Sequence, residues 1–276
     1  MRMTLEPALD HKEGQRIWSE ILQAAKNQNL TAPTVARSLA KLSFLTACFA
    51  IALIFGWFTT IPLALCLAIL FLSILMSQFA FLGHDAGHGA ISRSSVTNRL
   101  FGQFSMTLIA GMCFDAWFRT HKAHHQFCQN EDKDPDMAVS TVVSLTHKSS
   151  LNKGTVGQFF TKYQHIHIWF FSLFFAHSQR HLTQVDALRW RCFLDGFVTL
   201  LHLSIWILIP LCFDVSLSRI LLVYFVPAFI LGPHLAAIFW VNHIGMPVIE
   251  RQERFSFLEH QALTSRTVTI PKGMRS

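Results

Sequence analysis

Apolar residues of this chain gather in long runs, and the first run predicts two membrane-spanning helices. Residues 42–83 contain no aspartate, glutamate, lysine or arginine. A helix needs about 20 apolar residues to cross a bilayer, so the run accommodates two spans, near 42–59 and 62–82. Pro62 is expected to open the second span, because proline is favoured in the first turn of a helix. A helical hairpin satisfies every backbone polar group within lipid.

Two further runs predict a second hairpin. Asp195 is followed by 18 residues, and Arg219 by 30 residues, that include no aspartate, glutamate, lysine or arginine. Each run is close to the length of a membrane-spanning helix or longer. We therefore expect the third and fourth spans near 195–213 and 219–241.

Three other segments are expected to be helical without crossing the membrane. The apolar stretches 100–114 and 163–179 are too short or too interrupted to span a bilayer. We expect them to lie on the membrane or to pack beneath the soluble part of the protein. Residues 5–30 carry apolar side chains at helical spacing, which predicts an amphipathic helix.

Composition and charge support a membrane protein with a defined orientation. Charged residues make up 14% of the chain, whereas soluble domains contain roughly 25%. Residues 1–41 contain six lysines and arginines, residues 83–193 contain eleven, and residues 242–276 contain five. The predicted outer turns contain only one, Arg219. The positive-inside rule then places both termini and the central loop in the cytoplasm. We attribute the net charge of +7 to loops facing anionic lipid and expect no nucleic acid partner.

The predicted fold is therefore an all-α integral membrane protein. Four transmembrane helices form two hairpins, and a histidine-rich helical cap lies on the cytoplasmic side. Residues 1–41 form a cytoplasmic N-terminal segment and residues 42–270 form the membrane domain. Six cysteines include no C-x-x-C pair, so we interpret them as small buried apolar residues without a disulfide framework.

Two histidine clusters carry the candidate chemistry. His84 and His88 are four residues apart, and His121, His124 and His125 stand at positions i, i+3 and i+4. Residues at these spacings share one face of a helix. Imidazole nitrogens bind iron, zinc and copper. Burying this number of ring nitrogens without hydrogen-bond or metal partners would cost free energy. The clusters predict a metal site, with a hydrogen-bonded histidine network as the alternative.

Several residues near the clusters are candidates to orient the histidines. A metal-binding histidine usually donates its second ring N–H to a carboxylate or a carbonyl, which fixes the ring's tautomer. The alternative role for each acid or amide is a solvated loop charge or a helix cap. These candidates are Asp85, Asp115, Asn130, Asp134 and Asp136.

The sequence around the clusters resembles the membrane fatty acid desaturases. Residues 83–89, with 98–102 after them, resemble the first histidine box of that family, and residues 117–125 resemble the second. His243, within residues 242–247, resembles the family's isolated extra ligand. The resemblance covers most of residues 75–270, and residues 163–165 and 259–266 are similar to acyl-lipid and acyl-CoA members of bacterial type.

This resemblance implies an oxygen-dependent iron enzyme. The family holds two irons, uses dioxygen as co-substrate and acts on an acyl lipid or acyl-CoA within the membrane. A ferredoxin or a b-type cytochrome is the implied electron donor, because the chain shows no haem-attachment, iron–sulfur or dinucleotide-binding pattern. The implied metal ligands are His84, His88, His121, His124, His125 and His243. The implied orienting residues are Asp85, Asn130, Asp134, Asp136 and Asn242.

The sequence departs from the family at the third histidine box. The family has a second H-x-x-H-H after the part that matches residues 263–266, and no H-x-x-H-H follows His125 here. The favoured interpretation is a C-terminally incomplete chain that would hold at least one iron weakly. The other is that further histidines substitute as ligands, and these candidates are His147, His165, His167, His177 and His181.

Three alternative functions follow from these observations. The missing box is compatible with an inactive membrane protein that binds metal. An acyl-chain hydroxylase uses similar boxes and differs in its product. A transporter is disfavoured, since the histidines lie beyond the ends of predicted spans, whereas transporter sites lie near the middle of the membrane.

Overall fold

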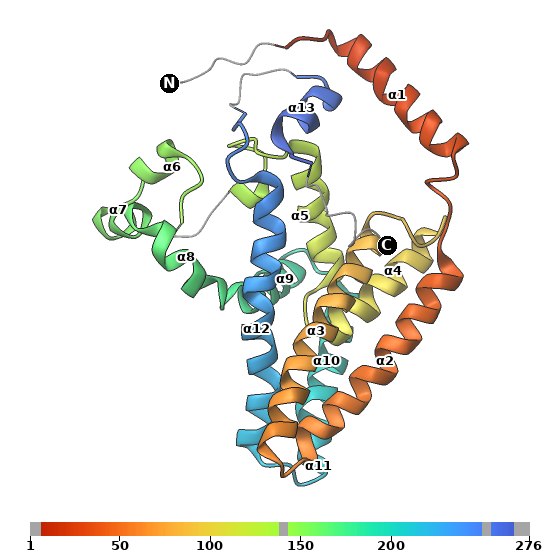
Figure 1. The fold of residues 1–276 in the computed structure, drawn as a ribbon, viewed down its shortest axis with the longest axis vertical. Helices are drawn as coiled ribbons and strands as arrows, with labels where there is room; N and C mark the ends of the chain where they lie inside the picture. The colour runs from red at the N-terminus through yellow and green to blue at the C-terminus, as the bar shows by residue number, and fades with distance from the viewer. Residues whose placement is uncertain (1–6, 138–142, 250–254, 268–276) are drawn as a thin grey trace. The chain divides into compact units, whose positions relative to one another are not determined.

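The structure is a computed structural model, and it describes residues 7–137, 143–249 and 255–267 (Figure 1). These residues form helices and connecting loops, with no β-strand among them. The predicted all-α fold is thereby confirmed. The chain divides into two compact units. The first unit comprises residues 1–31, 120–169 and 236–276, and the second comprises residues 32–119 and 170–235.

Among the described residues, four helices are long and apolar enough to cross a membrane, as predicted. They are α2 (Val35–Phe58), α3 (Pro62–Gly87), the continuous run Phe193–Cys212 and α12 (Leu217–His243). The third consists of α10 (Phe193–Leu203), the π-helical turn η3 (Ser204–Leu208) and α11 (Ile209–Cys212). Helix α2 begins before the predicted span and includes Arg37 and Lys41. Long basic side chains at a helix end can reach the membrane surface while their stems stay in apolar surroundings.

The remaining helices are shorter. Before the central loop they are α1 (His11–Asn27), α4 (Ser95–Gly102), the π-helix η1 (Gln103–Ala110) and α5 (Phe114–Phe127). After it they are the 3-10 turn η2 (Pro135–Met137), α6 (His147–Leu151), α7 (Thr155–Lys162), α8 (Gln164–Ser172), α9 (Phe175–Arg189) and α13 (Phe257–Thr264). Helix α1 falls within the amphipathic segment predicted at 5–30, whose first two residues lie outside the described part.

The first hairpin forms as the sequence predicts. Pro62 occupies the first turn of α3, and α2 and α3 run side by side in Figure 1. Phe49 of α2 packs edge-on against Phe79 of α3 and against Trp206 of η3, with ring centroids 5.9 and 5.5 Å apart. Such edge-to-face pairs are favourable beyond the area they bury. The second unit therefore has a shared aromatic core at this point.

Gly232 of α12 permits a close backbone approach within the second unit. A methyl group at this position would clash with the Ser172 carbonyl oxygen and would lie 2.7 Å from that of Leu173. Backbone oxygens cannot rotate away, so we expect Gly232→Ala to destabilise the protein by about 1–3 kcal/mol. Gly196→Ala is the matched control, because nothing lies within 4 Å of the added carbon there. Thermal unfolding of the purified protein in detergent measures both variants, and equal midpoints would contradict the close approach.

In the first unit, α1 packs along α13. Ser256 and Glu259 form a reciprocal capping box at the start of α13. The Glu259 carboxylate also accepts hydrogen bonds from the backbone N–H groups of Ala8 and Leu9, at 2.7 and 2.8 Å. Trp18 of α1 meets Phe257 edge-on, with ring centroids 5.1 Å apart. These contacts fix α13, whose far end reaches the candidate metal centre.

Candidate metal centre

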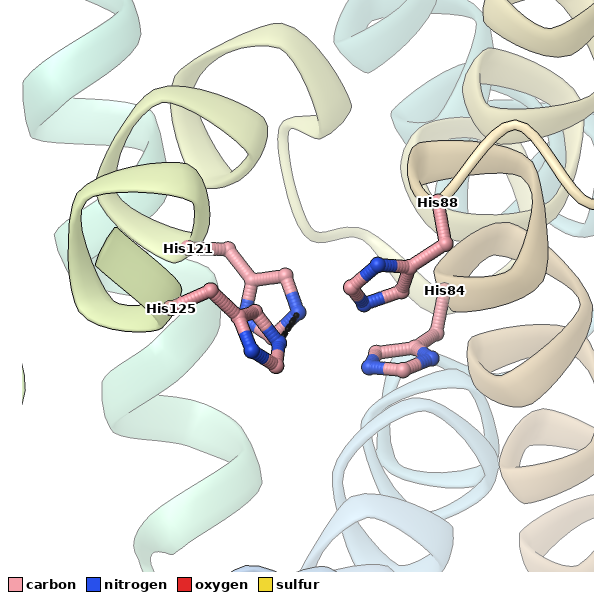
Figure 2. Close-up of side chains that lie close together, drawn as sticks. All are labelled: His84, His88, His121 and His125. Carbon is pink, nitrogen blue, oxygen red and sulfur yellow. Dashed lines mark hydrogen bonds between the residues drawn. The ribbon is translucent and has the colours of Figure 1, made fainter. Parts of the chain in front are cut away.

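The first histidine pair lies at the C-terminal end of α3. His84 is in the last turn of the helix, and His88 is its C-cap, with its N–H donating to the His84 carbonyl. The two ring centroids are 4.5 Å apart, and Figure 2 shows both rings on the same side of α3. The predicted common face is confirmed. Burial, followed by the neighbouring His84, lowers the pKa of His88. The neutral ring is the form that binds a metal.

Trp117 of α5 lies close to this pair. Its ring centroid is 5.8 Å from that of His84. A methyl group on Gly87 would lie 2.9 Å from the Trp117 ring, so this position requires a residue without a side chain. The glycine in the first histidine box therefore allows an aromatic side chain to pack against the end of α3.

Helix α5, which carries the second cluster, is capped by side chains from distant parts of the sequence. The Asp195 carboxylate accepts hydrogen bonds from the N–H groups of Asp115 and Ala116 at 3.1 and 3.0 Å. The Thr107 hydroxyl accepts from the Phe114 N–H at 3.0 Å. The first N–H groups of a helix have no partner within the helix. Asp195 marks only the edge of an apolar run in the sequence, and its role as a cap was not predicted.

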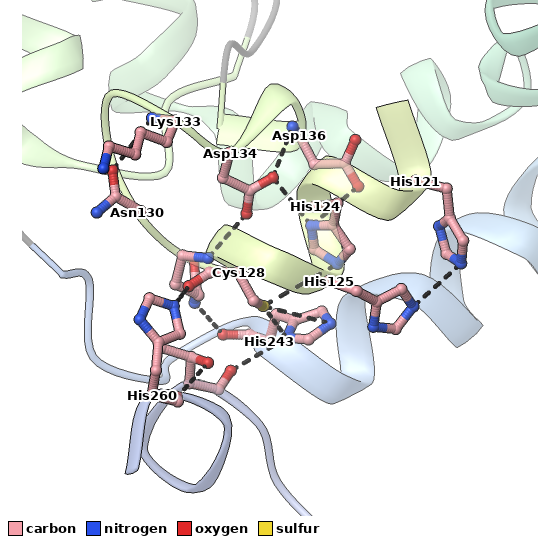
Figure 3. Close-up of polar contacts among 12 residues, drawn as sticks. His121, His124, His125, Cys128, Asn130, Lys133, Asp134, Asp136, His243 and His260 are labelled. Carbon is pink, nitrogen blue, oxygen red and sulfur yellow. Dashed lines mark hydrogen bonds and ion pairs between the residues drawn. The ribbon is translucent and has the colours of Figure 1, made fainter. Parts of the chain in front are cut away.

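His121 and His125 form the second pair, one turn apart on α5. Their Nε2 atoms are 3.0 Å apart, and their ring centroids are 4.5 Å apart (Figures 2 and 3). Two imidazole nitrogens that face each other at this distance either share a proton or bind a common cation. The predicted i, i+4 spacing is thus realised as a close pair of donor atoms.

His124 is held by two acidic residues of the loop after α5. Its Nδ1 lies 2.9 Å from Asp134 Oδ1 and 3.3 Å from Asp136 Oδ2 (Figure 3). Burial opposes the charged ring, but the hydrogen bond to Asp134 and the charges of Asp136 and Asp134 outweigh it and raise the pKa of His124. Asp134 is itself buried, and it also accepts from the Gln129 N–H at 2.8 Å. Two predicted orienting residues, Asp134 and Asp136, thus contact a predicted ligand.

His243, at the end of α12, lies beside His124. The two ring centroids are 5.0 Å apart. His243 Nδ1 is 3.0 Å from the Thr264 carbonyl oxygen, which accepts its proton, so Nε2 remains as the lone-pair nitrogen. The sequence indicated both histidines as ligands, and the structure brings them together. It also adds Thr264, which was not predicted as a partner.

Hydrogen bonds from two glutamine side chains and one further histidine connect the segments around His124 and His243. Gln129 Nε2 donates to the His243 carbonyl at 2.6 Å, and Gln261 Nε2 donates to the His125 carbonyl at 2.8 Å. His260 Nε2 donates to the Cys128 carbonyl at 2.6 Å. Helix α13 is therefore joined to the end of α5 through two of its side chains, as Figure 3 shows for His260.

The other predicted orienting residues lie differently. The Asn130 Oδ1 atom accepts from the N–H groups of Asp132 and Lys133, which shapes the loop that carries Asp134. Asp85 is exposed. Asn242 is exposed, and its carbonyl accepts from the Arg266 N–H at 3.2 Å. The assignment of Asp85, Asn130 and Asn242 as orienting residues stays a prediction.

The histidines considered as substitutes for the third box make other contacts. His167 donates to the Phe160 carbonyl, and His177 donates to the Phe225 carbonyl. Within the described residues, close groups of histidine, cysteine and acidic side chains include neither of them, nor His165 or His181. The side chain of His147 lies outside the described part.

Cys128 belongs to the same group as His124 and His243. Its Sγ atom is 3.2 Å from His243 Nδ1. Cys128 is buried, as predicted, and burial raises the pKa of its thiol to about 12. The described cysteines are all free, and the prediction that they are buried is right for Cys113 and Cys128 but wrong for Cys66 and Cys212, which are exposed. Cys128 stands four residues after His124, a spacing that places two metal ligands on one face of a helix. The sequence therefore contained a signal for Cys128 as a ligand, which its interpretation as a small apolar residue missed.

Comparison with known proteins decides the family. A family model described as fatty acid desaturase matches residues 57–274. This chain belongs to the fatty acid desaturase family. The match contains both histidine clusters and His243, so the resemblance inferred from the sequence is confirmed. Membership and the four apolar helices together make the chain a membrane protein.

Individual desaturases from several organisms are similar to part of the chain. A Delta(8)-fatty-acid desaturase of Helianthus annuus is 34% identical over 105 residues, which cover 34% of this chain and 23% of that protein. Fatty acid desaturase 3 of Bos taurus is 37% identical over 105 residues, covering 38% of this chain and 24% of its own length. A Delta 8-(E)-sphingolipid desaturase of Komagataella phaffii is 22% identical over 170 residues, which cover 59% of this chain and 29% of that protein. The match spans about a quarter of the length of the first two relatives.

Proposed function

We propose that this chain is an oxidoreductase that uses iron and dioxygen to introduce a double bond into an acyl chain. The observation that carries the proposal is the arrangement of His124 and His243. Each ring has Nδ1 hydrogen-bonded to a protein oxygen, that of Asp134 or Thr264, which leaves Nε2 as the donor atom for a metal. Family membership supplies the class of reaction.

The histidine-rich donor set fits iron. Imidazole nitrogen with nearby carboxylate is a donor combination that iron accepts. Bound iron supplies the activation of dioxygen and the removal of hydrogen from an unactivated carbon chain, which acid–base groups alone do not achieve. We propose the metal ligands to be His84, His88, His121, His124, His125 and His243.

The surrounding residues set the state of these ligands. Asp134 accepts the Nδ1 proton of His124, and the Thr264 carbonyl accepts that of His243, so both rings are held in one tautomer and one orientation. Burial lowers the pKa of His88, which favours the neutral ring that binds a metal. The paired Nε2 atoms of His121 and His125 need only a small separation to receive a cation.

The proposed substrate and partners follow from the family and from the charge pattern. We propose an acyl lipid or acyl-CoA as substrate and a ferredoxin or b-type cytochrome as electron donor. The concentration of lysine and arginine in residues 1–41, 83–193 and 242–276 supports a cytoplasmic location for the histidines and both termini.

Iron content and product analysis test the proposal together. Two irons per chain and conversion of a saturated acyl lipid to an alkene, in the purified chain reconstituted in lipid with a reductant and dioxygen, are the results that support the proposal, although the sequence shows no third histidine box. Metal analysis and mass spectrometry of the released acyl chains measure the two results. An alcohol product would instead indicate a hydroxylase. Bound metal without any conversion of acyl-lipid or acyl-CoA substrates would indicate a metal-binding protein and contradict the proposed reaction.

A further inference from the structure

Three potential ligand atoms converge where α5 ends in the first unit. Cys128 Sγ lies 4.0 Å from His124 Nε2 and 3.9 Å from His243 Nε2. One atom from each of the three residues lies within 4.8 Å of the other two. Cys128 and His124 are both buried, with 1% and 7% of their surfaces exposed. Figure 3 shows the sulfur directed toward both rings.

The remaining polar atoms of the two rings already have protein partners. His124 Nδ1 is bonded to Asp134, and His243 Nδ1 to the Thr264 carbonyl. Each ring therefore has Nδ1 engaged and Nε2 as its remaining donor atom. The sulfur faces Nε2 of His124, whereas in His243 it lies 3.2 Å from Nδ1 and 3.9 Å from Nε2. The single S–H proton cannot satisfy both rings, so the sulfur and the two Nε2 atoms form a donor set that a cation can bind.

The sulfur–nitrogen distances are compatible with a shared metal. A tetrahedral zinc with Zn–S of about 2.3 Å and Zn–N of about 2.0–2.1 Å places sulfur and nitrogen roughly 3.5 Å apart. The two separations here, 3.9 and 4.0 Å, exceed that value by a few tenths of an ångström.

We propose that Cys128 is a thiolate ligand of a divalent metal that His124 and His243 also bind. On binding, the thiol proton leaves to solvent and the metal–sulfur bond forms, with no change in oxidation state. Thiolate favours zinc and other soft or borderline metals over the metals preferred by carboxylate oxygen. Three protein ligands leave a fourth position for a water or another small ligand. The inference rests on the proposed function only in assigning the two histidines to a metal.

X-ray absorption at the zinc edge tests the assignment. The full chain in detergent, loaded with one equivalent of zinc, is expected to show a sulfur neighbour at about 2.3 Å and nitrogen neighbours at about 2.0–2.1 Å. Cys128→Ser is expected to lose the sulfur neighbour and to bind zinc at least about tenfold more weakly. Cys113→Ser is the control, because Cys113 is equally buried and contacts a threonine hydroxyl in place of histidine.

The outcomes separate the inference from the proposed function. A sulfur neighbour of zinc in the spectra of the wild type and Cys113→Ser, but not in that of Cys128→Ser, supports thiolate ligation. This result holds whether or not the chain desaturates lipids. Nitrogen neighbours alone in all three proteins, or sulfur retained in Cys128→Ser, would overturn the inference while leaving a histidine metal site. If the folded wild type bound no zinc and no iron, both the thiolate site and the proposed function would be rejected.

Discussion

His124→Ala is expected to lose metal from this centre and to lower the rate of double-bond formation by more than about 100-fold. Removal of a residue that only orients a ligand already costs about 10- to 100-fold in metal affinity or activity, and removal of the ligand itself costs more. His124 is the residue on which the local contacts converge, since it touches Asp134 and Asp136 and lies beside His243. Metal content per chain and the rate of alkene formation measure the loss.

Two variants separate a loss of ligand from a loss of fold. Asp134→Asn keeps the size of the side chain but removes the negative charge that holds the Nδ1 proton, so its effect is expected to fall between those of the wild type and His124→Ala. His167→Gln is the control, because His167 donates to the Phe160 carbonyl and an amide can donate in its place. Wild-type metal content in His124→Ala would remove this histidine from the ligand set.

Local patterns in the sequence were sufficient to predict the spans and the histidine pairs. The start of α3 at Pro62 and the common face of His84 and His88 depend on residues within one or two helical turns of each other. Hydrophobic length and helical spacing describe that scale directly. The same reasoning placed Asp134 close to the second cluster, since only ten residues separate it from His124.

Contacts between distant segments could not be predicted in this way. The Thr264 carbonyl that receives the His243 proton is a backbone group, which every residue possesses, so nothing in the sequence distinguishes it. Asp195 lies about eighty residues from the N–H groups that it caps. Cys128 differs from both, because its spacing from His124 was visible in the sequence. Its apolar neighbours favoured a packing role, and only the position of His243 reveals the second function that the thiol could serve.

Asp195→Ala is expected to lower the free energy of unfolding by about 3 kcal/mol or more. Asp195 is fully buried and accepts from Gln103 Nε2 at 2.6 Å as well as from the Asp115 and Ala116 N–H groups. Each buried donor left without a partner costs about 1–3 kcal/mol. The carboxylate also interacts favourably with the positive end of the helix dipole. Thermal unfolding in detergent measures the change, and hydrogen exchange of the Asp115 and Ala116 amides locates it.

Substitutions that remove the Asp195 cap in part or completely test its effect on α5 and on metal binding. Asp195→Asn retains one acceptor oxygen and loses the charge, so an intermediate effect is expected. Asp214→Asn is the matched control, because Asp214 bounds the same apolar run at its other end, is exposed, and has a φ of 57° that asparagine tolerates. Faster exchange confined to the first turn of α5 in the Asp195 variants would establish the cap. The same midpoint and exchange rates in all three variants would contradict it. Because α5 carries His121, His124 and His125, a loosened first turn is also expected to weaken metal binding, although Asp195 contacts none of these histidines.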